Sequence, residues 1–489
     1  MRRLLAFLLI LFAPLAQAAA LGAADARHLL NRAGFGATAQ EIADFARLAR
    51  AEAVERLLAG AVTEARTPLP AGVEDYIRPS RLRGLSDEEK QALLRTQFEI
   101  GVALRGWWLE EMLSTPSPLS ERMTLFWHNH FVSSQQKVKS ARLMAQQNRL
   151  LRRHALGNFG ALLHAVAKDP AMIVYLDSAT SRKEQPNENF AREVMELFTL
   201  GEGHYGERDV KEAARAFTGW SIEPETGEFK WRPFIHDRGE KTVLGRTGRF
   251  DGDEVLDILL EQPATAEFIV AKLWREFVSA DPEPQEVRRI AARFRDSGYE
   301  IRAALRALFL CEAFWAVENR AALIKSPVDL VAGTLRSLAF ETGELLPFVF
   351  TLRQLGQDLF GPPNVKGWPG GEAWINSSTL LARKQFLERL FRGQELRERG
   401  RDLGGAPARA ERVALRGGGR LGEEGRERLR RAMEAVRFDS AGWLALVERL
   451  RLAPQETLLP GEPAAAAPAA GEGIERIRLL VLDPMYQLK

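Results

Sequence analysis

Two histidines stand one residue apart in the stretch RMTLFWHNHF, residues 122–131. Imidazole nitrogens serve as general bases and as metal ligands. Helical spacing puts His130 on the apolar face of Met123 and Trp127. His128 then points about 200° away from His130, so the two rings could share one ion only if the helix ended near Trp127. The alternative is that these histidines are structural polar residues of a core helix.

A second stretch, residues 185–220, includes Glu193 and Glu196, two carboxylates three residues apart. Asn187 is expected to cap a helix, and a polar stripe lies opposite the apolar side of that helix. Glu193 and Glu196 could act as general acid and base, or bind a hard cation. The alternative is a solvated stripe in which Arg192 is the local ion-pair partner. The stripe comprises Asn189, Arg192, Glu193 and Glu196.

Two further stretches offer loop-borne groups. His236 and Asp237 follow a predicted hairpin and could provide a base beside a carboxylate, or merely form a turn. The segment GPPNVKGWPGGEAWINSSTL, residues 361–380, could be a rigid wall for a carbohydrate or a covering loop stapled by its tryptophans. The candidate ligand-binding residues are Asn187, Asn189, Trp220, Lys366, Trp368, Trp374 and Asn376.

These residues support two hypotheses. In the first, the protein is a metal-assisted hydrolase or a related enzyme with one catalytic cleft. A divalent ion such as Mg²⁺, Ca²⁺ or Zn²⁺ would be bound by members of the set His128, His130, Glu193 and Glu196. In the second, the protein binds a polysaccharide or a partner enzyme without catalysis, and the polar stretches form a buried hydrogen-bonded network. The candidate catalytic residues are His128, His130, Glu193, Glu196, His236 and Asp237, and one of the first two is expected to approach Glu193 or Glu196.

The elements that position these groups are mostly helices. Apolar residues repeat at three and four positions over most of residues 25–215, which predicts a mainly α, multi-helix globular body. Residues 217–245 alternate around a Pro-Glu-Thr-Gly turn and predict a small β-hairpin. The body is expected to span residues 19–395. An Arg/Gly- and Ala/Pro-rich variable region, partly disordered with one helix near 439–451, follows at 396–473, and residues 474–489 form a helix that packs on the body.

Residues 1–18 have the layout of a secretory signal peptide, with Arg2 and Arg3 before a short apolar run. They favour Sec export over twin-arginine export and a periplasmic or secreted protein without a transmembrane anchor after cleavage. The chain has 68 Lys and Arg against 65 Asp and Glu, a net charge of +3, which gives no argument for a nucleic-acid partner. Its single cysteine, Cys311, is expected to be a buried small hydrophobe.

Many of these stretches together resemble a bacterial family known as domain of unknown function 1800 (DUF1800). They are LLNRAGFGAT, WHNHF, PNENFAREVMELFTLGEG, DVKEAARAFTGW, HDRGEKTVLG, PATAEFIVAKLWREFV, IKSPVDLVAGTLR, PPNVKGWPGGEAWINSSTLLAR and the closing PMYQLK. The resemblance implies an exported, mainly helical protein without an established activity, and an exported partner similar to sulfatases and phosphatases. The chain departs from the family at Phe198, where many members have a histidine, and in the region 396–473.

Overall fold

The computed structural model describes residues 19–398, 423–464 and 472–489, and most of them are helical. Among these residues no helix combines the length and apolar character needed to cross a membrane. The helices of the first half are α1 (Gly22–Ala33), α2 (Ala39–Phe45), α3 (Arg50–Ala59), α4 (Pro79–Arg83), α5 (Asp87–Ser114), α6 (Pro118–His130), α7 (Gln135–Val138), α8 (Ala141–His154), α9 (Phe159–Ala167), α10 (Pro170–Tyr175), α11 (Glu188–Glu193), a π-helix (Val194–Thr199) and α12 (Glu207–Ala216). Those of the second half are α13 (Gly252–Glu261), α14 (Pro263–Phe277), α15 (Pro284–Asp296), α16 (Ile301–Phe309), α17 (Glu312–Trp315), α18 (Pro327–Ser337), α19 (Leu346–Gln354), α20 (Ser377–Glu398), α22 (Glu423–Ala435), α23 (Ser440–Arg449), α24 (Pro454–Leu458) and α25 (Gly473–Leu482). Short 3-10 turns lie at Ser178–Thr180, Val317–Asn319, Gly371–Trp374 and Pro484–Gln487.

Local sequence signals fix many of these helix starts. Ser86, Thr38 and Asp251 each accept a hydrogen bond from a backbone N–H of the first turn. The side chain of the glutamate three residues further on accepts a hydrogen bond from the backbone N–H of the capping residue, which completes a capping box. Proline occupies the first turn of α6, α10, α14, α15 and α18, where its missing N–H costs nothing. The structure confirms the mainly α prediction. The prediction succeeds because the capping residues and the apolar periodicity indicate the same helices.

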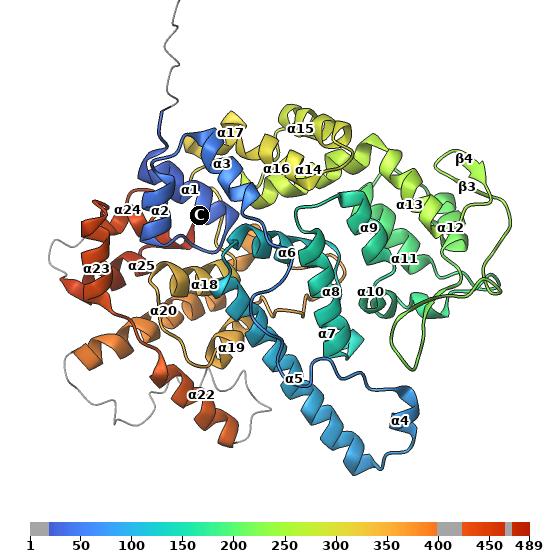
Figure 1. Ribbon diagram of the computed structural model, residues 1–489, viewed down its shortest axis with the longest axis horizontal. Helices are drawn as coiled ribbons and strands as arrows, with labels where there is room; N and C mark the ends of the chain where they lie inside the picture. The colour runs from blue at the N-terminus through green and yellow to red at the C-terminus, as the bar shows by residue number, and fades with distance from the viewer. Residues whose placement is uncertain (1–18, 399–422, 465–471) are drawn as a thin grey trace, which may run out of the picture.

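The helices form groups around one continuous apolar core (Figure 1). Helices α9 to α13 gather at one end of the molecule, and α1, α2, α18, α20, α23 and α25 at the other. α6 and α8 lie between the two ends, and α5 runs from an outward projection that it forms with α4 into the body. The N-terminal and C-terminal parts of the chain meet, since Arg27 of α1 donates to the Glu456 carbonyl of α24.

Two small antiparallel sheets interrupt the helices. Strand β1 (Trp220–Ile222) pairs with β2 (Phe229–Trp231), with Trp220 opposite Trp231, which confirms the predicted hairpin. A second hairpin joins β3 (Lys241–Val243) to β4 (Arg246–Gly248) and packs against α12. Its turn places Leu244 and Gly245 at φ 48° and 80°, the left-handed pair of a two-residue hairpin turn.

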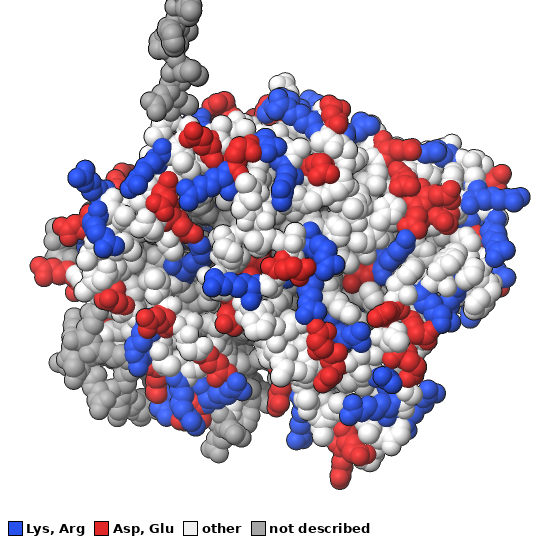
Figure 2. Space-filling view, viewed as in Figure 1, with Lys and Arg blue, Asp and Glu red and all other residues white. Residues whose placement is uncertain are grey.

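The C-terminal region contains more structure than the one helix expected. Within the variable region, α22, α23 and α24 are folded, and the Trp443 indole N–H of α23 donates to the Ser337 carbonyl at 3.1 Å. Residues 399–422 and 465–471 of that region lie outside the described part of the chain, as does the predicted signal peptide. The predicted C-terminal helix is α25, which packs against α20 and α23. On the face of the molecule shown in Figure 2, acidic and basic side chains intermingle.

Candidate functional site

Helix α6 continues through His130, so His128 and His130 point to different neighbours. Both side chains are buried. His128 lies among aromatic rings, whereas His130 faces the π-helix and α14. The geometry in which both rings would ligate one ion is therefore not formed, because it required the helix to end near Trp127.

His130 secures the end of the π-helix. Its Nε2 donates to the Phe198 carbonyl at 3.1 Å, and its Nδ1 accepts from the Lys272 ammonium of α14 at 3.0 Å. Lys272 also donates to the Leu197 carbonyl at 3.1 Å. The last carbonyls of a helix have no partner within that helix, and these two side chains supply donors for them. Burial, with the Lys272 charge beside it, lowers the pKa of His130 well below its ordinary value, which keeps the ring neutral.

His128 has a different environment and a different role. Its ring lies 5.3 Å from that of Trp108 and 5.7 Å from that of Trp368, centroid to centroid. Neither ring nitrogen has a hydrogen-bond partner among the described residues, and burial lowers its pKa to about 3. The ring therefore acts as a neutral, flat packing group.

Asn129, between the two histidines, holds the glycine-rich loop. Its side-chain oxygen accepts from the Trp368 backbone N–H at 2.7 Å. Gly367 lies directly over it with φ 84°, and a Cβ there would stand 2.2 Å from the Asn129 Oδ1. Only glycine fits this approach.

Glu193 and Glu196, the carboxylate pair, lie at the junction of α11 and the π-helix, and both side chains are half-buried. Burial raises the pKa of Glu193, and the charge of Glu196 raises it further, while Arg192 and Lys366 act in the opposite direction. Glu196 accepts a hydrogen bond from the Tyr205 hydroxyl at 2.9 Å. The pair thus consists of two neighbouring carboxylates in unlike surroundings, which is the condition for an acid and a base to coexist.

The histidine and carboxylate stretches meet through the backbone. His130 bonds the Phe198 backbone carbonyl through one ring nitrogen and the Lys272 ammonium through the other, so neither nitrogen contacts a carboxylate oxygen of Glu193 or Glu196. The expected histidine–carboxylate contact is therefore not made as a hydrogen bond. Across the described ranges no three His, Cys, Asp or Glu side chains converge so that they could hold a metal ion. The predicted set His128, His130, Glu193 and Glu196 consequently does not form a donor set there.

His236 and Asp237 belong to the hairpin's own scaffold. His236 Nδ1 bonds the Thr218 carbonyl at 2.9 Å, and burial lowers the pKa of its ring. Asp237 pairs with Arg215 at 2.7 Å and accepts from the Gly239 N–H at 2.8 Å. These contacts shape the turn, and none of them reaches the carboxylate pair.

The predicted ligand-binding residues are mostly structural. Trp220, Trp368 and Trp374 are only 4%, 4% and 6% exposed, so their rings pack inside the protein. For residues 361–380 the burial of Trp368 and Trp374 favours a covering loop held down by its tryptophans over a wall for a ligand. Asn187 and Asn376 accept from backbone N–H groups at helix starts. Asn189 and Lys366 remain exposed, and Lys366 lies close enough to Glu193 to lower its pKa.

A second cluster escaped sequence analysis: a buried ion-pair network of Arg122, Glu276, Asp329 and Lys489, called here the ion-pair core. Arg122 pairs with Asp329 and, at 3.3 Å, with Glu276. Lys489 pairs with Asp329 at 2.8 Å. Arg122, Asp329 and Lys489 are at most 6% exposed.

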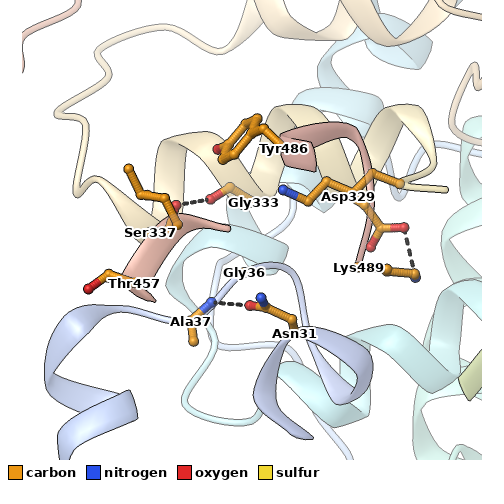
Figure 3. A pocket seen from close by; sticks show the side chains of 11 residues that line it. Asn31, Gly36, Ala37, Asp329, Gly333, Ser337, Thr457, Tyr486 and Lys489 are labelled. Atoms are coloured by element: carbon orange, nitrogen blue, oxygen red, sulfur yellow. Dashed lines mark hydrogen bonds and ion pairs between the residues drawn. The ribbon is translucent and has the colours of Figure 1, made fainter. Parts of the chain in front are cut away.

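A small cavity adjoins the ion-pair core (Figure 3). In this view Asp329 and Lys489 lie on one side, Ser337 and Thr457 on the other, Tyr486 above, and Asn31 and Ala37 below. Its volume of about 20 Å³ is room for one water molecule. The Lys325 ammonium lies 3.6 Å from the centre of the Tyr486 ring, and burial lowers the pKa of Lys325 to about 7. The stretches LLNRAGFGAT, IKSPVDLVAGTLR and PMYQLK meet here.

The residues missed by sequence analysis share one property. Lys272, Asp329 and Arg122 are charged residues whose neighbours on at least one side along the helix are apolar. Charged side chains are almost never fully buried unless they are paired, so an isolated charge on an apolar helix face signals a partner elsewhere. The sequence contains that signal but not the identity of the partner.

Comparison with known proteins gives one family. No curated protein and no solved structure matches the chain. The family described as Protein of unknown function (DUF1800) matches residues 28–487, which include the carboxylate pair and, apart from Lys489, the ion-pair core and the residues that line the cavity. The chain therefore belongs to the DUF1800 family.

Proposed function

We propose that this protein is an exported hydrolase of the cell envelope in which Glu193 is the general acid and Glu196 the general base. The observation that carries the proposal is the carboxylate pair itself. Its two half-buried members lie where α11 ends at Glu193 and a π-helix containing Glu196 begins. A π-helical turn is rare in proteins, and such turns occur frequently at functional sites. Export rests on the layout of residues 1–18, and an exported partner similar to sulfatases and phosphatases would work in the same compartment.

The two carboxyl groups divide the chemistry between them. The raised pKa of Glu193 lets it keep its proton closer to neutral pH, so it can donate that proton to a leaving-group oxygen. Glu196, oriented by the Tyr205 hydroxyl, is placed to accept a proton from water. This division is the one that glycoside hydrolysis requires, and we propose an envelope polysaccharide as the substrate class.

Hydrolysis by matched variants tests the proposal. Wild type, Glu193→Gln, Glu196→Gln and Glu188→Gln would be assayed against a panel of chromogenic glycosides and envelope polysaccharides. Loss of a general acid or base costs roughly 10²- to 10⁴-fold in kcat/KM. Glu188, a carboxylate of the same helix that pairs with Arg192 at 3.4 Å, is the control and should retain the rate. Absence of hydrolysis over the whole panel, or full activity in both pair variants, would refute the proposal.

A further inference from the structure

Two aromatic side chains project from the first hairpin into solvent. Phe234 is 67% exposed and Trp231 is 39% exposed, whereas Trp220, Trp368 and Trp374 are buried. Large exposed rings lose the hydrophobic stabilisation that burial would give, and exposed apolar patches mark binding surfaces. These two rings are separated by two residues of one turn.

The turn that carries the rings is rigid. The Arg232 N–H donates to the Gly219 carbonyl at 2.8 Å, and the Lys183 N–H donates to the Ile235 carbonyl at 2.8 Å. The Trp231 ring packs on the His236 ring at 4.9 Å, and a Cβ at Gly219 would stand 2.8 Å from it. The Trp231 ring and the backbone on both sides of Phe234 are therefore held in place before any ligand binds, which lowers the entropy cost of binding.

Positive charges surround the same turn. The Lys183 ammonium lies 3.4 Å from the Phe234 carbonyl. The backbone hydrogen bond between Lys183 and Ile235 joins two segments of the chain, and Arg182 lies in the first of them and Arg238 in the second. Both arginines are exposed, and neither has an ion-pair partner in the part of the chain described. Of the nearby acids, Asp237 is paired with Arg215, and Glu184 lies 3.8 Å from the Lys183 ammonium. Arg182 and Arg238 therefore remain as the cations of these segments that no neighbouring acid among the described residues neutralises.

We infer that Trp231, Phe234, Lys183, Arg182 and Arg238, the aromatic–basic patch, bind an acidic polysaccharide. The apolar faces of sugar rings stack on flat aromatic side chains, and the cations pair with carboxylate or sulfate groups along the polymer. Two rings in a narrow turn are too little apolar area for a stable protein interface, which buries about 800 Å² per partner. The inference goes beyond the proposed hydrolase, because this binding needs no turnover at Glu193.

Calorimetric titration of the purified full chain tests the inference. The probes are polygalacturonate and dextran sulfate, with neutral dextran for comparison. Wild type should bind both acidic polymers, more weakly as salt rises, and should not bind dextran. Phe234→Ala should lower the affinity about tenfold, since one stacking contact is lost while the exposed ring contributes little to folding. Arg238→Gln should lower the affinity and reduce its salt dependence.

Phe98→Ala is the matched control, because Phe98 is an exposed ring, at 38% exposure, that belongs to α5 and not to the aromatic–basic patch. It should bind as wild type does. Equal affinity of Phe234→Ala and wild type would overturn the inference, as would equal binding of neutral dextran. Binding to vesicles containing phosphatidylglycerol without binding to either acidic polymer would overturn it in favour of a membrane surface. Glu193→Gln should bind the polymers normally, which separates this result from that of the hydrolysis assay.

Discussion

Replacing Asp329 by asparagine should strongly destabilise the fold. The substitution keeps the shape of the side chain but removes the negative charge that faces Arg122 and Lys489, all three being at most 6% exposed. Breaking a buried ion pair from one side costs roughly 3–5 kcal/mol, because the remaining charges stay buried without compensation. Against a total stability of about 5–15 kcal/mol, that is a large fraction.

Guanidinium unfolding followed by circular dichroism would measure this loss. Asp87→Asn is the control, since the Asp87 carboxylate is fully exposed and its pair with Lys90 at 3.5 Å is screened by solvent, so this contact contributes little to stability. The double variant Asp329→Asn/Lys489→Met should be less destabilised than the sum of its single variants, because removing both charges leaves fewer uncompensated groups. Additive losses in the double variant, or a loss for Asp329→Asn no larger than for Asp87→Asn, would refute the reasoning.

The same network predicts the acid limb of stability. Arg122 and Lys489 hold the pKa of Asp329 far below its ordinary value, against the effect of burial. A depressed folded-state pKa contributes stability that is present above the unfolded pKa of about 3.9 and is lost as pH falls below it. The difference between wild type and Asp329→Asn should therefore narrow below about pH 4.

Two further substitutions have defined outcomes. Lys325→Met should stabilise the protein by a few kcal/mol at pH 6, because the wild-type chain must bury a charged ammonium there. Between the folded pKa of about 7 and the unfolded value of 10.5 the wild type gains stability as pH rises, so unfolding measurements should show a smaller stability advantage of the variant at pH 9.5 than at pH 6. A difference that does not change with pH would contradict the burial argument. Gly367→Ala should lower the free energy of unfolding by roughly 1–3 kcal/mol in thermal unfolding, because the new Cβ would clash with Asn129. Gly370→Ala is the control: its φ of 71° gives the same kind of backbone strain, but no described atom lies near its Cβ. Equal losses in the two variants would show that the Asn129 contact does not matter.

Sequence patterns predicted the fold well where local signals determine it. The Pro-Glu-Thr-Gly turn and the alternation around Trp220 and Trp231 were enough for the first hairpin. The second was missed as a strand pair because Leu244, and not asparagine or aspartate, takes the first left-handed position of its turn. β-Propensity and turn signals give little information where tertiary contacts hold a residue such as leucine in a conformation that it rarely adopts.

Prediction of the site was less complete, because side-chain partners are a tertiary property. Helical spacing correctly separated His128 from His130, but it could not show that His130 faces a backbone carbonyl and not a carboxylate. Tryptophan content suggested a ligand wall at Trp368, whereas the loop folds inward onto Asn129. Long-range pairs such as Arg122–Asp329, 207 residues apart, leave no periodic trace in the sequence.

The most direct test of the proposed function measures activity and stability together in Glu193→Gln. Burial and the Glu196 charge raise the pKa of Glu193, so the folded state binds more protons than the unfolded state above the unfolded pKa, and stability falls as pH rises through that window. A neutral glutamine should remove this cost: the variant should hydrolyse the polysaccharide at least about 100-fold more slowly and be at least as stable as wild type at pH 7. A variant that keeps the wild-type rate, or loses it only together with stability, would contradict a catalytic role for the carboxylate pair.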